Sequence, residues 1–202
     1  MIVAFTDYEQ DEVTTILAAY ARTLLNAAGS LISQTLAPPT DSYSVNIQAV
    51  LASGHVPFFF FGHGDPDPPA LLGQDKTTAL DASNSGLLRN RFVCAICCYS
   101  IAALYEAVSN HNATVLGYDG ELAVILCEPY SSKMEDCVLA GPRALLFQGC
   151  TAGEACQEIQ ARFYAMAREL ITGSIEDQVV AVFMELNAGL IKLLGDSKIR
   201  IK

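Results

Sequence analysis

The stretch PFFFFGHGD, residues Pro57–Asp65, decides the fold and points to one end of it. Its four consecutive phenylalanines form a short run bounded by turn residues on both sides. Continuous apolar runs of this length are typical of strands that are buried on both faces of a parallel sheet. The sequence therefore predicts a buried strand over Phe58–Phe61, with the imidazole of His63 just beyond its carboxyl end.

A second stretch of the same kind, FVCAICCYS (Phe92–Ser100), begins 35 residues further on and ends at a pair of cysteines. Ligands of open α/β sheets bind beyond the carboxyl ends of the strands, so we expect His63 and a cysteine to lie side by side there. Neighbouring side chains of a strand point to opposite faces, so only one of Cys97 and Cys98 can meet His63. A thiol next to an imidazole predicts a cysteine hydrolase.

The other apolar patterns alternate between strand and helix. Strands are predicted over residues 2–5, 31–36 and 113–118, and helices over residues 9–28, 45–51 and 101–108. Such alternation implies right-handed crossovers and a parallel sheet. We therefore expect an α/β protein, a three-layer α/β/α sandwich around a central, mostly parallel sheet of five or six strands.

The second half of the chain is harder to interpret. Residues 65–88 are predicted to be the longest loop, residues 122–127 a strand and residues 128–141 another loop. Capping boxes at Thr151 and Ser174 predict two helices, the second with an apolar face from Val179 to Leu194. Residues 1–202 are expected to form a single domain, in which residues 174–202 are a C-terminal helix and tail.

The bulk composition excludes several classes of protein. No apolar run reaches the ~18 residues of a membrane span, and the N-terminus lacks the pattern of a signal peptide. An odd seven cysteines favour a reducing, cytoplasmic location without a disulfide framework. The net charge of −10 disfavours nucleic acids and anionic membranes as partners.

Metal and nucleotide sites are also disfavoured. Cys94 and Cys97 have the spacing of half a zinc site, but no second Cys-x-x-Cys or His pair completes four ligands. No Gly-x-Gly-x-x-Gly or Walker loop follows a predicted strand, which argues against a doubly wound nucleotide-binding module. We expect neither a metal nor a cofactor.

Three stretches together resemble the cysteine peptidases of clan CD with the caspase-like fold, which include caspases, gingipains, separase and bacterial CHAT proteases. They are FFGHG (Phe60–Gly64), VCAICCYS (Val93–Ser100) and FQGCTAGEA (Phe147–Ala155), the last of which looks like the helix entry of the bacterial members. The resemblance covers residues 1 to about 172. Chain size and the lack of caspase signatures favour the bacterial CHAT or gingipain-like branch.

The resemblance implies roles for individual residues. His63 matches the catalytic histidine, Cys98 the nucleophile, with Ser100 two residues on, and Gly64 the oxyanion glycine. Cys97 replaces a commoner small residue and remains the alternative nucleophile. In chemical terms, the backbone N–H groups of Gly64 and Cys98 would bind the oxyanion, and a helix beginning after Cys98 would lower its thiol pKa.

The loop after the first strand helps to build the substrate pocket in this fold, and acidic residues there imply a preference for Arg or Lys. Residues 6–12 include no basic side chain, and Asp7 is our candidate for the pocket floor. Asp7 could instead be the N-cap of the following helix. Asp119, after a later strand, and Asp65, in the long loop, are further candidates for substrate binding.

The sequence thus predicts an endopeptidase that acts on proteins or peptides through a thioester acyl-enzyme. The activity of a cytoplasmic protease must be controlled. We therefore expect a regulatory protein partner or a rearrangement of residues 65–88 and 128–141. The resemblance suggests bacterial stress or defence signalling. Two alternatives remain: a catalytically inactive caspase-like protein that binds a partner, and an amidase that uses the same residues on small amides.

Overall fold

The protein is built on a six-stranded sheet. The computed structural model describes residues 1–201 of the chain. The strand order is β2-β1-β3-β7-β8-β9, and every neighbouring pair is parallel except β8 and β9. The strands are β1 (Ile2–Phe5), β2 (Gln34–Leu36), β3 (Phe58–Phe61), β7 (Phe92–Ile96), β8 (Thr114–Tyr118) and β9 (Ile191–Leu194). The predicted α/β class and mostly parallel sheet are confirmed. Lys202, the last residue of the predicted tail, lies outside the described residues.

The four phenylalanines of β3 show why a continuous apolar run forms a strand here. Phe59 and Phe61 point into the core on one face of the sheet, whereas Phe58 and Phe60 point into the core on the other. All four are fully buried. Because helices cover both faces of the sheet, the side chains on both faces of this strand must be apolar.

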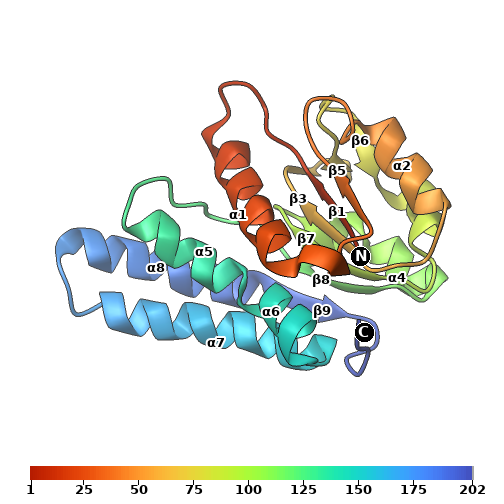
Figure 1. Ribbon diagram of the computed structural model, residues 1–202. Coiled ribbons are helices and arrows are strands. Elements are labelled where there is room, and N and C mark those ends of the chain that lie inside the picture. The colour runs from red at the N-terminus through yellow and green to blue at the C-terminus, as the bar shows by residue number, and fades with distance from the viewer. Residues whose placement is uncertain (202) are drawn as a thin grey trace.

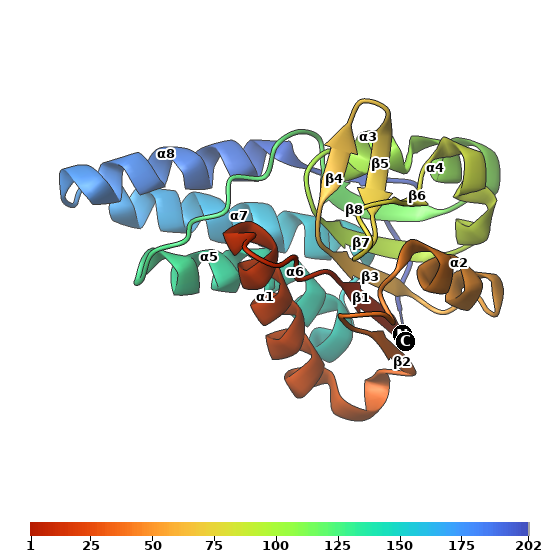
Figure 2. The ribbon, with the colours of Figure 1, turned by 90° about the horizontal axis from the view of Figure 1, so that it is seen from above.

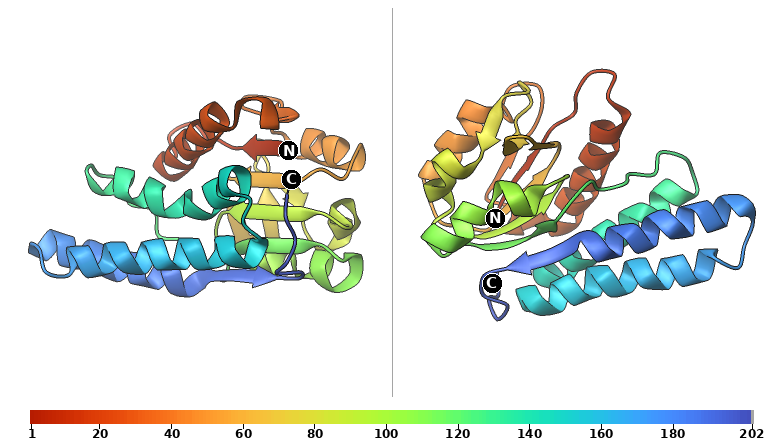
Figure 3. Two further views of the ribbon diagram at one scale, coloured as in Figure 1. Left: turned by 60° about the horizontal axis from the view of Figure 1, so that its bottom comes forward. Right: turned by 180° about the vertical axis from the view of Figure 1, so that it is seen from behind.

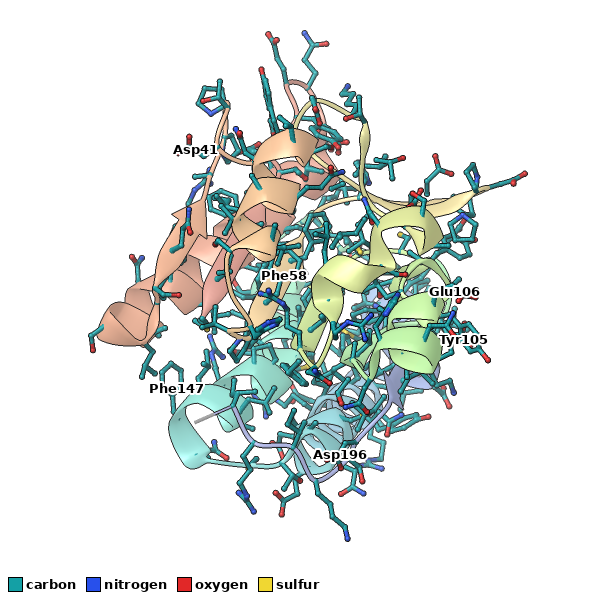
Figure 4. The ribbon with its side chains drawn as sticks, turned by 90° about the vertical axis from the view of Figure 1, so that its right-hand side faces the viewer. Asp41, Phe58, Tyr105, Glu106, Phe147 and Asp196 are labelled. Carbon is teal, nitrogen blue, oxygen red and sulfur yellow. The ribbon has the colours of Figure 1, made fainter. Side chains whose placement is uncertain are left out.

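Helices cover the two faces unequally, and the result is three layers (Figure 1). The first face is covered by α1 (Glu12–Ala28), α5 (Tyr130–Val138), α6 (Ala140–Arg143), α7 (Ala152–Leu170) and α8 (Ile175–Leu190). The second face is covered by α2 (Ser44–Ala52), α3 (Ser100–Ala103), α4 (Tyr105–His111) and the 3-10 turn η2 (Ala82–Leu88). A further 3-10 turn, η1 (Gly29–Leu31), follows α1. Figure 4 shows Phe58 in the interior, on this second face of the sheet, and Tyr105 of α4 at the margin of the molecule.

The helices α7 and α8 pack against one another as a long antiparallel pair that extends beyond the sheet (Figures 1 and 3). Both begin at the predicted capping boxes, where Thr151 and Ser174 accept from the N–H groups of Glu154 and Asp177. Among the described residues, 1–201, no helix is long and apolar enough to cross a membrane.

The predicted loop over residues 65–88 is wrong. It holds a small antiparallel sheet of β4 (Gly64–Pro66), β5 (Pro69–Leu72) and β6 (Thr78–Leu80), followed by η2. Strands of three or four residues between prolines leave no alternation long enough to recognise. In Figure 2, β4 and β5 lie beside α3, close to the carboxyl ends of β3 and β7.

Three further expectations fail in the second half of the chain. Residues 122–126 form neither a helix nor a strand, and residues 128–141 include α5 and α6 rather than a loop. A π-helical turn, η3 (Ala144–Gln148), follows α6. Leu193 and Leu194 belong to the edge strand β9 and not to α8, because Ile191 to Leu194 pair with β8 (Figure 3).

The start of α1 also differs from its prediction. The helix begins at Glu12, and its N-cap is Asp11, whose carboxylate accepts from the N–H groups of Val13 and Thr14. Asp7, which the sequence offered as a possible N-cap, does not cap the helix. Residues 6–10 are therefore free to run as a loop across the carboxyl ends of the strands.

Candidate active site

The candidate site lies where β3 and β7 end side by side. Phe61 pairs with Ile96, so His63 and Cys98 each lie two residues beyond the last paired position. Both line a single cavity of about 280 Å³, together with Gly64, Tyr99 and residues 121, 122 and 124. The structure thus brings together the three residues for which the sequence predicted a catalytic role.

Gly64 packs directly against the main chain of Cys98. A Cβ on Gly64 would lie 2.9 Å from the carbonyl carbon of Cys98 and closer still to its oxygen. Only glycine fits at such an approach. The carbonyl of His63 accepts from the N–H of Leu72 at 3.0 Å, and hydrogen-bonded pairs alternate along an antiparallel ladder, so the N–H of Gly64 points away from β5. This N–H is available to a bound group.

The turn at Cys98 is held by Ser100. The Ser100 hydroxyl is fully buried; it accepts from the N–H of Tyr118 at 2.8 Å and lies 3.2 Å from the carbonyl oxygen of Ala95. It therefore ties the end of β7 to the end of β8. Tyr99, between Cys98 and Ser100, has a left-handed backbone (φ 53°), and its N–H donates to Gly120 at 2.8 Å. The Cys-x-Ser spacing thus has a structural cause.

Cys97 and Cys98 separate to the two faces, as the sequence predicted for neighbours of a strand. The side chain of Cys97 belongs to the core on the α2 and α4 face, and its residue is 1% exposed. Cys98 is only half-buried and packs on the α1 face, the face of the cavity. Burial raises the pKa of the Cys97 thiol well above its ordinary value. Cys98 is the accessible thiol of the pair.

The expected lowering of the Cys98 pKa is wrong for this conformation. Burial raises the pKa of the Cys98 thiol above its ordinary value, and the Glu121 carboxylate adds to this effect. The N–H groups of Leu122 and of Cys98 itself act in the opposite direction but do not prevail. The helix that follows, α3, has only four residues. The thiol is therefore protonated at neutral pH.

His63 is paired with Asp11, a residue for which the sequence predicted no role. Nε2 of His63 lies 2.5 Å from Oδ2 of Asp11, while Oδ1 of the same carboxylate caps α1. Burial alone would raise the pKa of Asp11, but the hydrogen bonds from His63, Thr14 and Val13 lower it below its usual value. A carboxylate only accepts, so Nε2 carries the hydrogen and Nδ1 is left as the basic nitrogen.

Tyr8 supports His63 from the side of the first strand. Its ring lies 5.3 Å from the imidazole, and its hydroxyl donates to the carbonyl of Gly73 at 2.6 Å. Burial, followed by the charges of Asp75 and Asp11, raises the pKa of Tyr8 to about 12. The phenol therefore stays neutral, and it packs the ring of His63 rather than exchanging protons with it.

The predicted substrate-binding acids lie apart from the cavity. Asp7 forms an ion pair with Arg22 at 2.9 Å and accepts from Thr15, so its carboxylate is already occupied. Asp65 lies in β4 and accepts from the N–H of Asp67. Asp119 is exposed after β8, and its N–H donates to Leu190. None of the three lines the cavity that holds Cys98.

Three other acids line this cavity or a second one. Glu121 lines the cavity of Cys98, and its carboxylate accepts from the hydroxyl of Tyr99 at 3.3 Å. Asp11 and Glu12 line an adjoining cavity of about 520 Å³ together with Leu126. All three acids lie within a few residues of a predicted candidate, Asp119 or Asp7. The sequence signal was a cluster of acids in each loop, which did not distinguish among its members.

The seven cysteines are all free thiols. Among residues 1–201, no three His, Cys, Asp or Glu side chains are placed to hold a metal ion together.

Neither a search of protein-family models nor a search of curated proteins finds a match to this chain. Among solved structures, the chain is similar to the Arg-specific cysteine proteinase gingipain R, with a TM-score of 0.60 and 12% sequence identity. The similarity covers all of this chain and 47% of that one, so the chain spans about half the length of gingipain R. The chain therefore has a caspase-like fold.

Proposed function

We propose that the protein is a cysteine endopeptidase with a His63 and Cys98 dyad. The observation that carries this proposal is that His63 and Cys98 line one cavity with Gly64 packed on the Cys98 main chain. A solved cysteine proteinase with the same fold supports it. An imidazole, a thiol and two N–H groups are the parts that acyl transfer to sulfur requires.

The chemistry proceeds in two stages. The Cys98 sulfur attacks the scissile carbonyl, and the N–H groups of Gly64 and Cys98 stabilise the oxyanion. The thiol proton passes to the leaving amine through Nδ1 of His63, the C–N bond breaks, and a thioester remains. Water then attacks the thioester with His63 as general base, which releases the acid and restores the thiol. Asp11 holds His63 in the tautomer that these transfers need.

The proposed substrates are proteins or peptides cleaved after Arg or Lys. Glu121 on the wall of the cavity, and Asp11 with Glu12 in the adjoining one, supply negative charge around the bound chain. A carboxylate recognises a guanidinium through paired hydrogen bonds. Gingipain R, which shares the fold, is an Arg-specific proteinase.

We also propose that the activity is gated by a regulatory protein partner or an activation step. The raised pKa of the Cys98 thiol supports this, because a buried and protonated thiol is a poor nucleophile. A conformational change that exposes Cys98, or moves Glu121 away, would lower that pKa.

Active-site probes test the proposal directly. Acyloxymethyl ketones that carry Arg, Lys or Asp are to be incubated with the wild type and with Cys98→Ala, Cys97→Ala and His63→Ala. Labelling by the Arg and Lys probes that is lost in Cys98→Ala and His63→Ala but retained in Cys97→Ala is the expected result. Labelling that survives Cys98→Ala rejects this nucleophile, and labelling by the Asp probe alone rejects the basic preference.

The second candidate is a catalytically inactive caspase-like protein that binds a partner. The observation in its favour is the same protonated thiol, which in a non-catalytic protein would simply be a half-buried cysteine. It predicts that no probe labels Cys98 in any condition, including with activating partners present.

A further inference from the structure

A buried amide on α8 is bound to the wall of the Cys98 cavity. Asn187 is fully buried. Its Oδ1 accepts from the N–H of Ala123 at 3.0 Å, and its Nδ2 donates to the carbonyl of Ala123 at 2.9 Å. A second contact joins Nδ2 to the sulfur of Met134 at 3.7 Å. Buried polar groups require such partners, and here both main-chain groups of a single residue supply them.

The segment that Asn187 holds has little else to fix it. Residues 121–126 join β8 to α5 without forming a helix or strand. Within residues 1–201, the backbone of residues 123–126 has no hydrogen-bond partner other than Asn187. The two bonds imitate the pairing of a neighbouring strand, so one side chain of α8 substitutes for a missing sheet edge.

This segment is also the part of the chain that faces the candidate nucleophile. Glu121, Leu122 and Val124 line the cavity of Cys98, and Leu126 lines the adjoining cavity beside Asp11. Leu122 and Val124 lie immediately before and after the residue that Asn187 binds. A displacement of Ala123 must therefore move the wall of both cavities.

We propose that Asn187 is a positioning residue, whose amide fixes the main chain at Ala123 so that Glu121 and Leu122 form the wall facing Cys98. This inference rests on the proposed peptidase activity. The ionisable groups around Cys98 are Glu121 and Tyr99 on this side, His63 across the cavity and Cys97 beneath. Only Glu121 belongs to the segment that Asn187 holds, so loss of the amide changes the surroundings of Cys98 through that segment.

The test measures the reactivity of Cys98 rather than peptide cleavage alone. Iodoacetamide alkylation of each cysteine is followed by peptide mass spectrometry between pH 6 and pH 10 in the full-length protein. We expect Asn187→Ala to alkylate Cys98 at least about threefold faster near pH 7.5, because release of the wall lessens burial and removes Glu121. The fully buried Cys94 and Cys137 should stay protected, which separates a local release from general unfolding.

Two further variants complete the experiment. Ala123→Pro removes the main-chain N–H that donates to Asn187 and does not change α8. It should therefore reproduce the effect of Asn187→Ala. Gln160→Ala removes another amide that donates to a main-chain carbonyl, that of Ile191 at 3.1 Å away from the cavity, and should alkylate as the wild type does. If the wild type cleaves peptides, kcat/KM should fall about tenfold in Asn187→Ala and Ala123→Pro but not in Gln160→Ala.

An unchanged alkylation rate and pH profile of Cys98 in both Asn187→Ala and Ala123→Pro overturns the proposal. So does labelling of Cys94 and Cys137 in parallel with Cys98, which would assign Asn187 to general stability. A wild type without peptidase activity rejects the proposed function but leaves the alkylation comparison decisive for Asn187.

Discussion

Gly64 and Cys98 are in contact through their main chains, so that a Cβ on Gly64 would lie 2.9 Å from the carbonyl carbon of Cys98. This contact joins the end of β3 to the turn after β7. It places the N–H of Gly64 beside Cys98, where the oxyanion of the proposed reaction would form. Any side chain at position 64 must therefore push the two strand ends apart.

Gly64→Ala should abolish most of the activity at a moderate cost in stability. Overpacking of this kind destabilises a protein by about 1–3 kcal/mol, and an oxyanion donor that is moved out of place slows acyl transfer by about 100-fold or more. Urea unfolding and peptide hydrolysis measure the two effects. Gly54→Ala is the matched control, because a Cβ at Gly54 meets no atom within 4 Å. Normal hydrolysis by Gly64→Ala would refute the role of this contact.

The two oxygens of Asp11 allow its two roles to be separated. Asn caps a helix as well as Asp does, but its NH2 group would face Nε2 of His63 and favour the wrong tautomer. We expect Asp11→Asn to keep the helix cap and lose at least about 100-fold in kcat/KM. Asp11→Ala should lose the same activity and also about 1 kcal/mol of stability with the cap.

The pH dependence of stability checks the same pair. The pKa of Asp11 is lowered in the folded protein, so its charge stabilises the fold above the pKa of the unfolded chain. That contribution is lost as the pH falls through the folded pKa, below about pH 4. Any advantage of the wild type over Asp11→Asn in thermal melts should therefore disappear in this acidic range, and a constant difference down to pH 2 would contradict the pairing.

The strand ends that carry His63 and Cys98 could be predicted from the sequence because each depends on local pattern. The runs Phe58–Phe61 and Phe92–Ile96 are apolar on both faces, and their order along the chain implies parallel neighbours. The capping boxes of α7 and α8 are equally local. The placement of His63 and Cys98 in one cavity follows from these elements alone.

The remaining features depend on contacts between distant residues. Asp7 and Asp11 lie in one acidic loop, and only the position of Arg22 and His63 in space decides which of them is an ion-pair partner and which faces the site. The leucines of residues 190–194 fit a helix by spacing, but pairing with β8 draws them into β9. Likewise, Leu122 and Val124, which line the cavity of Cys98, belong to a segment that the sequence predicted to be a strand.

Ser100→Ala should lower stability rather than remove a catalytic group. The hydroxyl accepts from the buried N–H of Tyr118, and an orphaned N–H in such a place costs about 1–3 kcal/mol. Urea unfolding should show this loss, whereas Ser53→Ala, at an exposed helix end, should change little. A stable Ser100→Ala protein that nonetheless lacks activity would instead place Ser100 in the chemistry.

Glu121→Gln should separate thiol reactivity from substrate recognition. The Glu121 carboxylate raises the pKa of the Cys98 thiol, so its neutral isostere should lower that pKa and speed alkylation by iodoacetamide about two- to threefold at pH 7.5. If Glu121 also binds Arg or Lys of the substrate, kcat/KM for basic peptides should fall about tenfold in the same variant. A variant with a more reactive thiol and a lower kcat/KM for basic peptides would show that Glu121 binds the basic side chain of the substrate. Faster cleavage of basic peptides would show instead that Glu121 only restrains Cys98, and that the basic side chain is bound by Asp11 and Glu12 in the adjoining cavity.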